Sequence, residues 1–250
     1  MKKLCVMVVM AAFAGLVLRA EDKPLQMLGR EPEELHRTTP MTVALASPLQ
    51  IPFSSWNVYG LRLNLIYGRS YDMYGLDLGL VSRTDHDLYG LGVDLFSWVE
   101  GNLYGVAVSP FANVNFGDVI GFQGSVFANV SFSDTIGVQF ALMNFAPTFV
   151  GAQLGVLFSR NSEASVGFQL GLVNDNVSDF AGFSLGVLEN NAKNLNGVQI
   201  GVLNLVDDWA TGVQIGVING ATRMSGMQFG LFNLIGNGAV PVSILFNLNF

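Results

Sequence analysis

Large apolar residues alternate with small or polar residues over most of the chain. In the segment GVQIGVIN, which starts at Gly212, every second residue is aliphatic and the residues between them are Gly, Gln and Gly. Successive side chains of a strand point to opposite faces, so this segment predicts a strand with one apolar face and one small polar face. The segment YGLDLGL, which starts at Tyr74, keeps the same pattern with Asp77 in the place of Gln.

Glycines anchor the pattern at separations of 14 to 16 residues. The anchoring glycines are Gly60, Gly75, Gly90, Gly105, Gly121, Gly137, Gly151, Gly167, Gly182, Gly197, Gly212 and Gly226. Polar segments such as SRTDHD (82–87), SRNSEA (159–164) and NNAKN (190–194) separate the apolar stretches and are rich in residues that favour reversals. We therefore predict a dozen repeat units, each a strand of about 9–10 residues followed by a turn of about 5.

Two flanking segments complete the predicted set of strands. The segment MTVALASPLQI (41–51) alternates like a strand, and Pro48 restricts that strand to an edge or a bulge. The segment PVSILFNLNF (241–250) places five apolar residues on one face: Val242, Ile244, Phe246, Leu248 and Phe250. The sequence predicts an all-β domain over residues 41–250 with about 14 strands.

Four observations favour an up-and-down transmembrane β-barrel. The polar segments between units offer almost no apolar side chains that a solenoid coil could turn inward, and the strand length matches a bilayer crossing. Tyr59, Tyr74, Tyr89 and Tyr104 recur on the apolar face, where an aromatic belt at the lipid interface lies. The last strand ends on Phe250, which resembles the C-terminal signal of bacterial outer-membrane barrels and predicts outer-membrane assembly machinery as a partner, besides membrane lipid.

Other observations favour the alternative, a parallel β-solenoid with coils of about 15 residues and the apolar face inside. An asparagine holds the same place in five repeats, and stacked asparagines can hydrogen-bond from coil to coil. They are Asn144, Asn174, Asn204, Asn219 and Asn233. Loop lengths also do not alternate between short and long, as they do in outer-membrane barrels. The barrel is the first prediction and the solenoid the second.

In the barrel, the small polar face lines the lumen. The predicted lumen residues are Arg62, Asn64, Asp77, Asp94, Gln123, Gln139, Gln153, Gln169, Gln199, Gln214 and Gln228. The glutamines lie two residues after their glycines and form a ring that suits passage of small hydrophilic solutes. A structural role, in which neighbouring glutamines hydrogen-bond one another, explains the same column.

The N-terminus predicts an exported protein. Lys2 and Lys3 precede an apolar run from Leu4 to Leu18, and a small residue follows at Ala20, as in a signal peptide over residues 1–20. Residues 21–40 form a charged leader. Cys5 is the single cysteine and lies inside the signal segment, so the mature chain has no disulfide and no zinc–cysteine site.

Composition narrows the function classes. Hydrophobic residues make up 50% of the chain and charged residues 12%, and the mean hydropathy of +0.44 indicates that some apolar surface faces something other than water. The net charge of -7 and the lack of a Lys/Arg stripe argue against nucleic-acid binding.

Catalytic motifs are missing from the sequence. The two histidines are His36, in the leader, and His86, in a polar segment, so neither a triad nor a histidine-based metal site is supported. The paired acids at Asp85 and Asp87, and at Asp207 and Asp208, are typical of solvated turns. The GxQxG spacing does not form a phosphate-binding loop. We therefore expect no enzymatic activity and no cofactor.

The repeats resemble a bacterial cell-surface repeat family, found in exported proteins and some lipoproteins, whose units read GxQxGxxN or GxQxAGLxN. The resemblance covers roughly residues 57–233 and is strongest from Gly137 onward; the units before Gly121 lack the glutamine. It implies a location in the cell envelope or at the surface and carries no catalytic or ligand residues. This chain lacks the cysteine that anchors the lipoprotein members to lipid.

Overall fold

The computed structural model describes residues 37–47 and 49–250, and all regular structure in them is β. The predicted signal peptide, most of the leader, His36 and Pro48 lie outside the described residues. The strands are β1 (Thr38–Ala46), β2 (Leu49–Ile51), β3 (Asn57–Ser70), β4 (Met73–Thr84), β5 (Leu88–Val99), β6 (Leu103–Ser109), β7 (Ala112–Asn115), β8 (Val119–Ser125), β9 (Ala128–Ser131), β10 (Thr135–Ala146), β11 (Phe149–Asn161), β12 (Ser165–Asn176), β13 (Asp179–Ala192), β14 (Asn194–Ile235) and β15 (Val242–Asn249). In this part of the chain no helix has the length and apolarity to cross a membrane.

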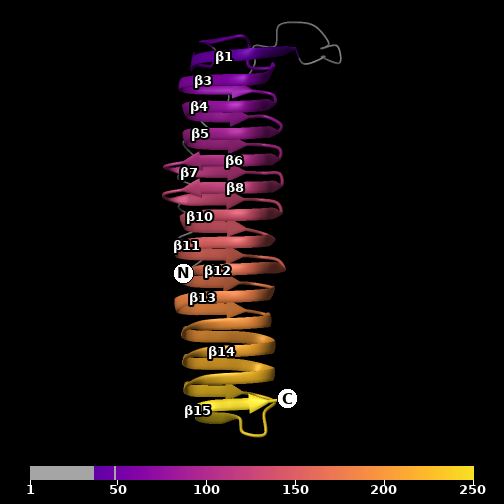
Figure 1. Ribbon diagram of the computed structural model, residues 1–250, viewed down its shortest axis with the longest axis vertical. Coiled ribbons are helices and arrows are strands. Elements are labelled where there is room, and N and C mark those ends of the chain that lie inside the picture. Colours follow the sequence, from indigo (N-terminus) through magenta and orange to yellow (C-terminus); the bar gives the residue numbers. More distant parts are fainter. Residues whose placement is uncertain (1–36, 48) are drawn as a thin grey trace, which may run out of the picture. The chain divides into compact units, whose positions relative to one another are not determined.

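Neighbouring repeats pair in parallel, with equivalent residues side by side. Gly137 pairs with Gly151, and Gly151 with Gly167, and the same register continues along the stack. Figure 1 shows the coils stacked in chain order from β3 to β15, with β1 next to β3. β2 lies beyond β1 at the end of the sheet. The fold is a β-solenoid of about 11 turns. The predicted up-and-down barrel is therefore wrong, because its strands would pair antiparallel and close, whereas β2 and β15 are the two ends of this sheet.

A coil is one winding of about 15 residues. Each coil contains two runs in which inward and outward side chains alternate. In the coil anchored by Gly197, four inward side chains are at most 3% exposed: Leu195, Gln199, Asn204 and Val206. A corner at Val202 and Leu203 lies between its two inward-facing runs. The inward residues of the second run come from segments that the sequence assigned to turns, since Ser82 and Thr84 of SRTDHD are each 1% exposed. Small polar residues suit this place because the interior itself is polar.

The anchoring glycines occupy a backbone conformation that other residues avoid. All twelve have φ between 125° and 151°, a region that L side chains rarely adopt. A Cβ at Gly90 would also overlap the carbonyl oxygen of Gly75 in the preceding coil. The repeated glycine therefore permits both the local backbone and the close stacking of coils.

The two faces of the strands are reversed relative to the predicted solenoid. The glutamines point inside and the large apolar residues point outside, where Phe140, Ile215 and Phe229 are 47%, 42% and 43% exposed. The predicted solenoid places the apolar face inside, whereas the predicted barrel has the right orientation of the faces and the wrong direction of the strands.

Apolar side chains enter the interior in two buried clusters. These clusters are Val58, Met73, Leu88, Val99, Leu103, Ala107 and Val119, and Phe180, Ala192, Leu195, Val206, Ala210, Ala221, Met224 and Ile235.

The two ends of the sheet are antiparallel to their neighbours. The strand predicted over 41–51 is split, with β2 folding back against β1, which itself pairs in parallel with β3. At the other end β15 runs antiparallel to the last coil of β14, with Phe246 beside Phe229. The reversed directions end the parallel stack at both ends.

Candidate functional site: a polar interior and an uncharged apolar exterior

Glutamine side chains form hydrogen-bonded ladders inside the solenoid. Gln139 donates to Gln123 at 2.8 Å, Gln153 to Gln139 at 2.9 Å and Gln169 to Gln153 at 3.0 Å. A second run joins Gln228, Gln214 and Gln199. Ser184 holds the equivalent place between the two runs and interrupts them.

A second ladder of asparagines runs beside the first. Asn174 donates to Asn190 at 3.1 Å, Asn190 to Asn204 at 2.8 Å, and Asn204 to Asn219 at 2.8 Å. The ladder then reaches Asn233 at 2.9 Å. The hydrogen bonding that the sequence suggested for a solenoid is confirmed.

All eleven predicted lumen residues point into the interior of the solenoid. None of them is more than 4% exposed. The glutamines bond to each other, so the column acts as the structural ladder that the sequence analysis gave as the alternative to a pore. A closed barrel wall, which the lumen prediction requires, is not formed by the described strands.

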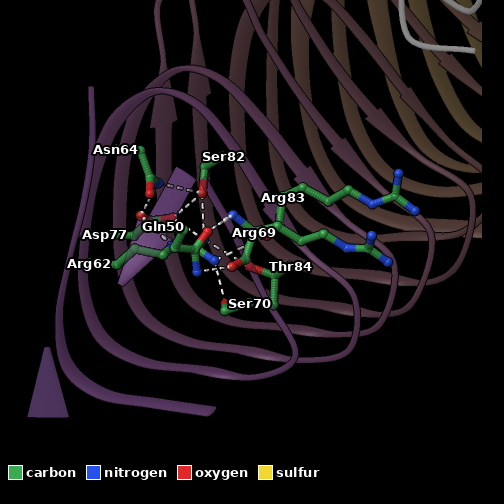
Figure 2. Close-up of polar contacts among 9 residues, drawn as sticks. All are labelled: Gln50, Arg62, Asn64, Arg69, Ser70, Asp77, Ser82, Arg83 and Thr84. Atoms are coloured by element: carbon green, nitrogen blue, oxygen red, sulfur yellow. Dashed lines mark hydrogen bonds and ion pairs between the residues drawn. The ribbon is translucent and has the colours of Figure 1, made fainter. Parts of the chain in front are cut away.

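The coils nearest the N-terminus replace the amides with a buried ion pair. The guanidinium of Arg62 is fully buried and donates from Nε to Asp77 Oδ1 at 2.8 Å and from Nη2 to Asp77 Oδ2. Figure 2 shows hydroxyl groups around it, and the side chains of Arg69 and Arg83 extending away from it. The remaining acceptors of Arg62 are the hydroxyls of Ser70, Ser82 and Thr84 and the carbonyl of Arg83.

A second carboxyl group lies close to this pair. Burial, with the neighbouring charge of Asp77, raises the pKa of Asp94 to about 8. Burial is the largest single influence on the pKa of Arg62 and lowers it, but the charge of Asp77, the hydrogen bond to Asp77 and the charges of Asp94 and Asp85 together raise the pKa above its usual value. At neutral pH the carboxyl of Asp94 is therefore mostly protonated and adds little charge beside the ion pair of Arg62 and Asp77.

The buried cluster is suited to structure and not to catalysis. Arg62, Asp77 and Asp94 are at most 2% exposed, so a substrate has no access to them. Sequence reasoning identified these three residues but missed Ser70, Ser82 and Thr84, which it assigned to turns or left out. The alternation of small polar residues in SRTDHD is the signal that could have found the last two.

The outside of the solenoid carries a continuous surface without charge, which we call the apolar face. It consists of the outward residues one before, one after and three after each anchoring glycine. None of them is charged, and the polar ones are Asn196, Thr211 and Ser225. The row three after the glycines is Leu63, Leu78, Val93, Val108, Gly124, Phe140, Leu154, Leu170, Leu185, Ile200, Ile215 and Phe229.

The corners of the coils extend the apolar face around one side, which we call the apolar edge. It consists of Leu65, Ile66, Leu80, Leu95, Pro110, Phe111, Val126, Phe127, Leu142, Val156, Leu157, Leu172, Val187, Leu188, Val202, Val217 and Leu231. Leu65 is 61% exposed and Val126 is 56% exposed. Together the face and the edge leave two adjoining sides of the coils apolar.

Four tyrosines stack along the border between the apolar face and the polar turns. The ring centroids of Tyr59, Tyr74, Tyr89 and Tyr104 are 4.3, 4.7 and 4.7 Å apart. The hydroxyl of Tyr89 donates to Asp87 at 3.2 Å. Burial is the main cause that raises the pKa of Tyr74 to about 12, so the hydroxyl of Tyr74 remains neutral. The tyrosines predicted as an interface belt thus lie on the outer surface.

Charged residues gather away from the apolar face, on the polar turns and the second run of the coils. Arg69 pairs with Asp85 at 2.6 Å, and Arg160 with Asp175 at 3.4 Å. These pairs are partly exposed, so each adds little stability. The hydrogen bond that the ring Nδ1 of His86 makes to the carboxylate of Asp72 raises the pKa of His86. Among the described residues, no group of three His, Cys, Asp or Glu could hold a metal ion. The charged surface residues therefore lie off the apolar face, although the second run also carries exposed apolar residues such as Phe132, Phe232 and Leu234.

Comparison with protein-family models, curated protein sequences and solved structures gave no match to this chain. The resemblance to the bacterial surface-repeat family therefore stays a prediction from the GxQxGxxN units.

Proposed function

We propose that this protein is a structural surface protein that adheres to lipid through its apolar face and apolar edge. The observation that carries the proposal is the absence of any charged residue from the apolar face over all twelve anchored coils. Eleven steps of about 4.8 Å and a width of about five residues give this face roughly 900 Å². The largest apolar patch on a typical soluble monomer is about 300–600 Å².

Lipid fits this surface better than a second protein copy. The apolar face and the apolar edge lie on two adjoining sides of the coil, so a flat partner face would cover only one of them. Fluid hydrocarbon adapts to both. Parallel pairing satisfies the backbone groups of inner coils within the stack, which contact with hydrocarbon requires. The stacked tyrosines add aromatic rings with polar tips at the border, the arrangement that membrane interfaces favour.

An export route and an envelope location complete the proposal. They are supported by the signal-peptide pattern of residues 1–20 and by the resemblance of the repeats to surface proteins. Acidic residues occur on the polar turns, for example Asp118, Asp134 and Asp179. Electrostatic attraction to anionic head groups is therefore not the source of binding. We expect attachment to neutral lipid, with weak dependence on salt.

Flotation of the full chain with vesicles of a zwitterionic phospholipid tests the proposal. The triple variant Phe140→Lys, Ile215→Lys and Phe229→Lys places three charges on the apolar face, and we expect at least a tenfold loss of the floated fraction. Its control, Ser162→Lys, Thr222→Lys and Asn237→Lys, adds the same charge at exposed positions away from the apolar face and should float like the unmodified chain. Far-ultraviolet circular dichroism verifies that all variants are folded.

The competing outcomes are distinct. An unmodified chain that stays monodisperse in plain buffer and does not float overturns the lipid proposal. A stable dimer in plain buffer that the face variant dissociates would show that the apolar face binds a second copy, and would also overturn it.

A further inference from the structure

The two ends of the stack differ in how they protect the edge of the sheet. At the N-terminal end, β2 has only three residues and is followed by Pro52. Gln50 fastens it to the backbone of Arg69, donating to the carbonyl at 2.6 Å and accepting from the amide at 3.1 Å. Short edge strands and nearby prolines are common means of preventing edge-to-edge pairing.

The C-terminal end lacks the short edge strand and the glutamine clasp of β2, although Pro241 directly precedes its last strand. β15 has eight residues, and within the described residues it pairs only with β14. Its outward residues Val242, Ile244, Phe246 and Leu248 are 52–63% exposed. Figure 1 shows β15 as the last strand of the stack. A long apolar edge strand is a template for pairing with a further strand.

The side chains of β15 specify which strand would fit. Asn247 lies beside Gln228 and Ser243 beside Asn233, so polar residues of β15 continue the polar interior. The apolar residues between them continue the apolar face, as Phe246 does beside Phe229. Leu245 interrupts this alternation, because its φ is 75° and its side chain is 70% exposed. Along the rest of the edge, a pairing strand must place polar residues inward and apolar residues outward. A second β15 meets this requirement.

We propose that two copies of this chain join end to end by antiparallel pairing of β15 with β15. The two-fold axis of an antiparallel pair within one sheet is perpendicular to the sheet, so both apolar faces point to the same side. The dimer would present one continuous apolar surface of twice the length. Pairing itself needs no lipid; only the use of the doubled surface rests on the proposed function.

Pairing of β15 also limits the assembly to two copies. Extension in the other direction would have to use β2, which is short and followed by a proline. An isologous contact about a two-fold axis uses up both exposed edges, so the assembly closes and does not form a filament. The contact area is small, and we expect a dimer that dissociates on dilution.

Sedimentation of the full chain in detergent micelles, over a hundredfold range of concentration, tests the inference. We expect a monomer–dimer equilibrium. The variant Ile244→Lys with Phe246→Lys should weaken it at least tenfold, because lysines on an edge strand oppose pairing. The matched control is Leu49→Lys with Ile51→Lys, which places the same charges on the exposed strand at the opposite end and should leave the dimer intact.

Disulfide trapping gives a second measurement that does not depend on stability. In a Cys5→Ser background, Ile244→Cys, Phe246→Cys and Leu248→Cys are introduced singly, and at least one should crosslink two chains, since facing residues of antiparallel strands lie within disulfide reach. Ile51→Cys should not. A monomer at all concentrations, a dimer sensitive to the β2 lysines, or an open filament would overturn the inference. Loss of flotation with an intact dimer would overturn only the proposed function.

Discussion

Ser159→Asn tests whether the interior ladders stabilise the solenoid. In the asparagine ladder, Ser159 stands where the neighbouring coils carry Asn144 and Asn174. Three buried atoms have no hydrogen-bond partner at this place: Asn144 Nδ2, Ser159 Oγ and Asn174 Oδ1. An asparagine would accept from Asn144 and donate to Asn174, which would join two separate runs of the ladder.

The structure supplies the space for this change. The coil with Gly186 and Asn190 has the same corner length as the coil with Gly155 and Ser159, and it holds the asparagine in the ladder. Two new buried hydrogen bonds contribute about 1 kcal/mol each, and ordering the longer side chain offsets part of this gain. We expect the free energy of unfolding to rise by about 1–2 kcal/mol.

Urea unfolding in a mild detergent, followed by circular dichroism, measures this change. The reverse variant Asn190→Ser removes the ladder bonds to Asn174 and Asn204 and a bond to the Ile200 carbonyl. Breaking these buried bonds should cost about 3 kcal/mol. The reasoning fails if Ser159→Asn lowers stability, or if Asn190→Ser leaves it unchanged.

Two further predictions concern the backbone and the buried charges. Gly90→Ala should cost at least about 3 kcal/mol of unfolding free energy, because φ is 136° there and the Cβ would overlap the preceding coil. Gly92→Ala should be nearly neutral, since its Cβ would lie 3.6 Å from the nearest atom; equal effects in urea unfolding would contradict the argument. Asp94→Asn should remove a pH dependence of the free energy of unfolding. The pKa of Asp94 is about 8 in the folded chain and about 4 in the unfolded chain. The free energy of unfolding is therefore highest below pH 4 and falls as the pH rises towards 8. At pH 7 the variant should therefore be more stable than the unmodified chain by about 4 kcal/mol. If the difference in unfolding free energy between the two proteins stays constant from pH 4 to pH 9, this explanation is refuted.

The sequence predicts the repeat well but not the direction of the strands. The glycine spacing and the alternation around residues such as Gln214 specify two-faced β-strands, and these are confirmed. Up-and-down and coiled arrangements share that pattern, because alternation describes one strand and not its neighbour. The choice depended on segments such as SRTDHD, whose inward residues were expected to be apolar.

That expectation failed for a physical reason. A polar interior stabilised by amide and hydroxyl ladders accepts Ser82 and Thr84 as inward residues, and both are buried beside Arg62. The eleven interior residues were correctly placed on one face by their spacing. Their hydrogen bonding to one another depends on which coils become neighbours, and so does the exposure of the edge of β15. The pattern within one strand does not specify these neighbours.

The polar interior also bears on the proposed function. Ladder hydrogen bonds, the parallel backbone pairing and the glycine contacts lie inside the coils, so they do not require large apolar residues outside. Exposed apolar side chains add contacts between neighbouring coils, but threonine or lysine at some of these positions would keep the chain foldable. A parallel sheet usually has both faces covered, and here the outer face is bare. Folding therefore leaves the uncharged exterior unexplained, and binding to an apolar surface explains it.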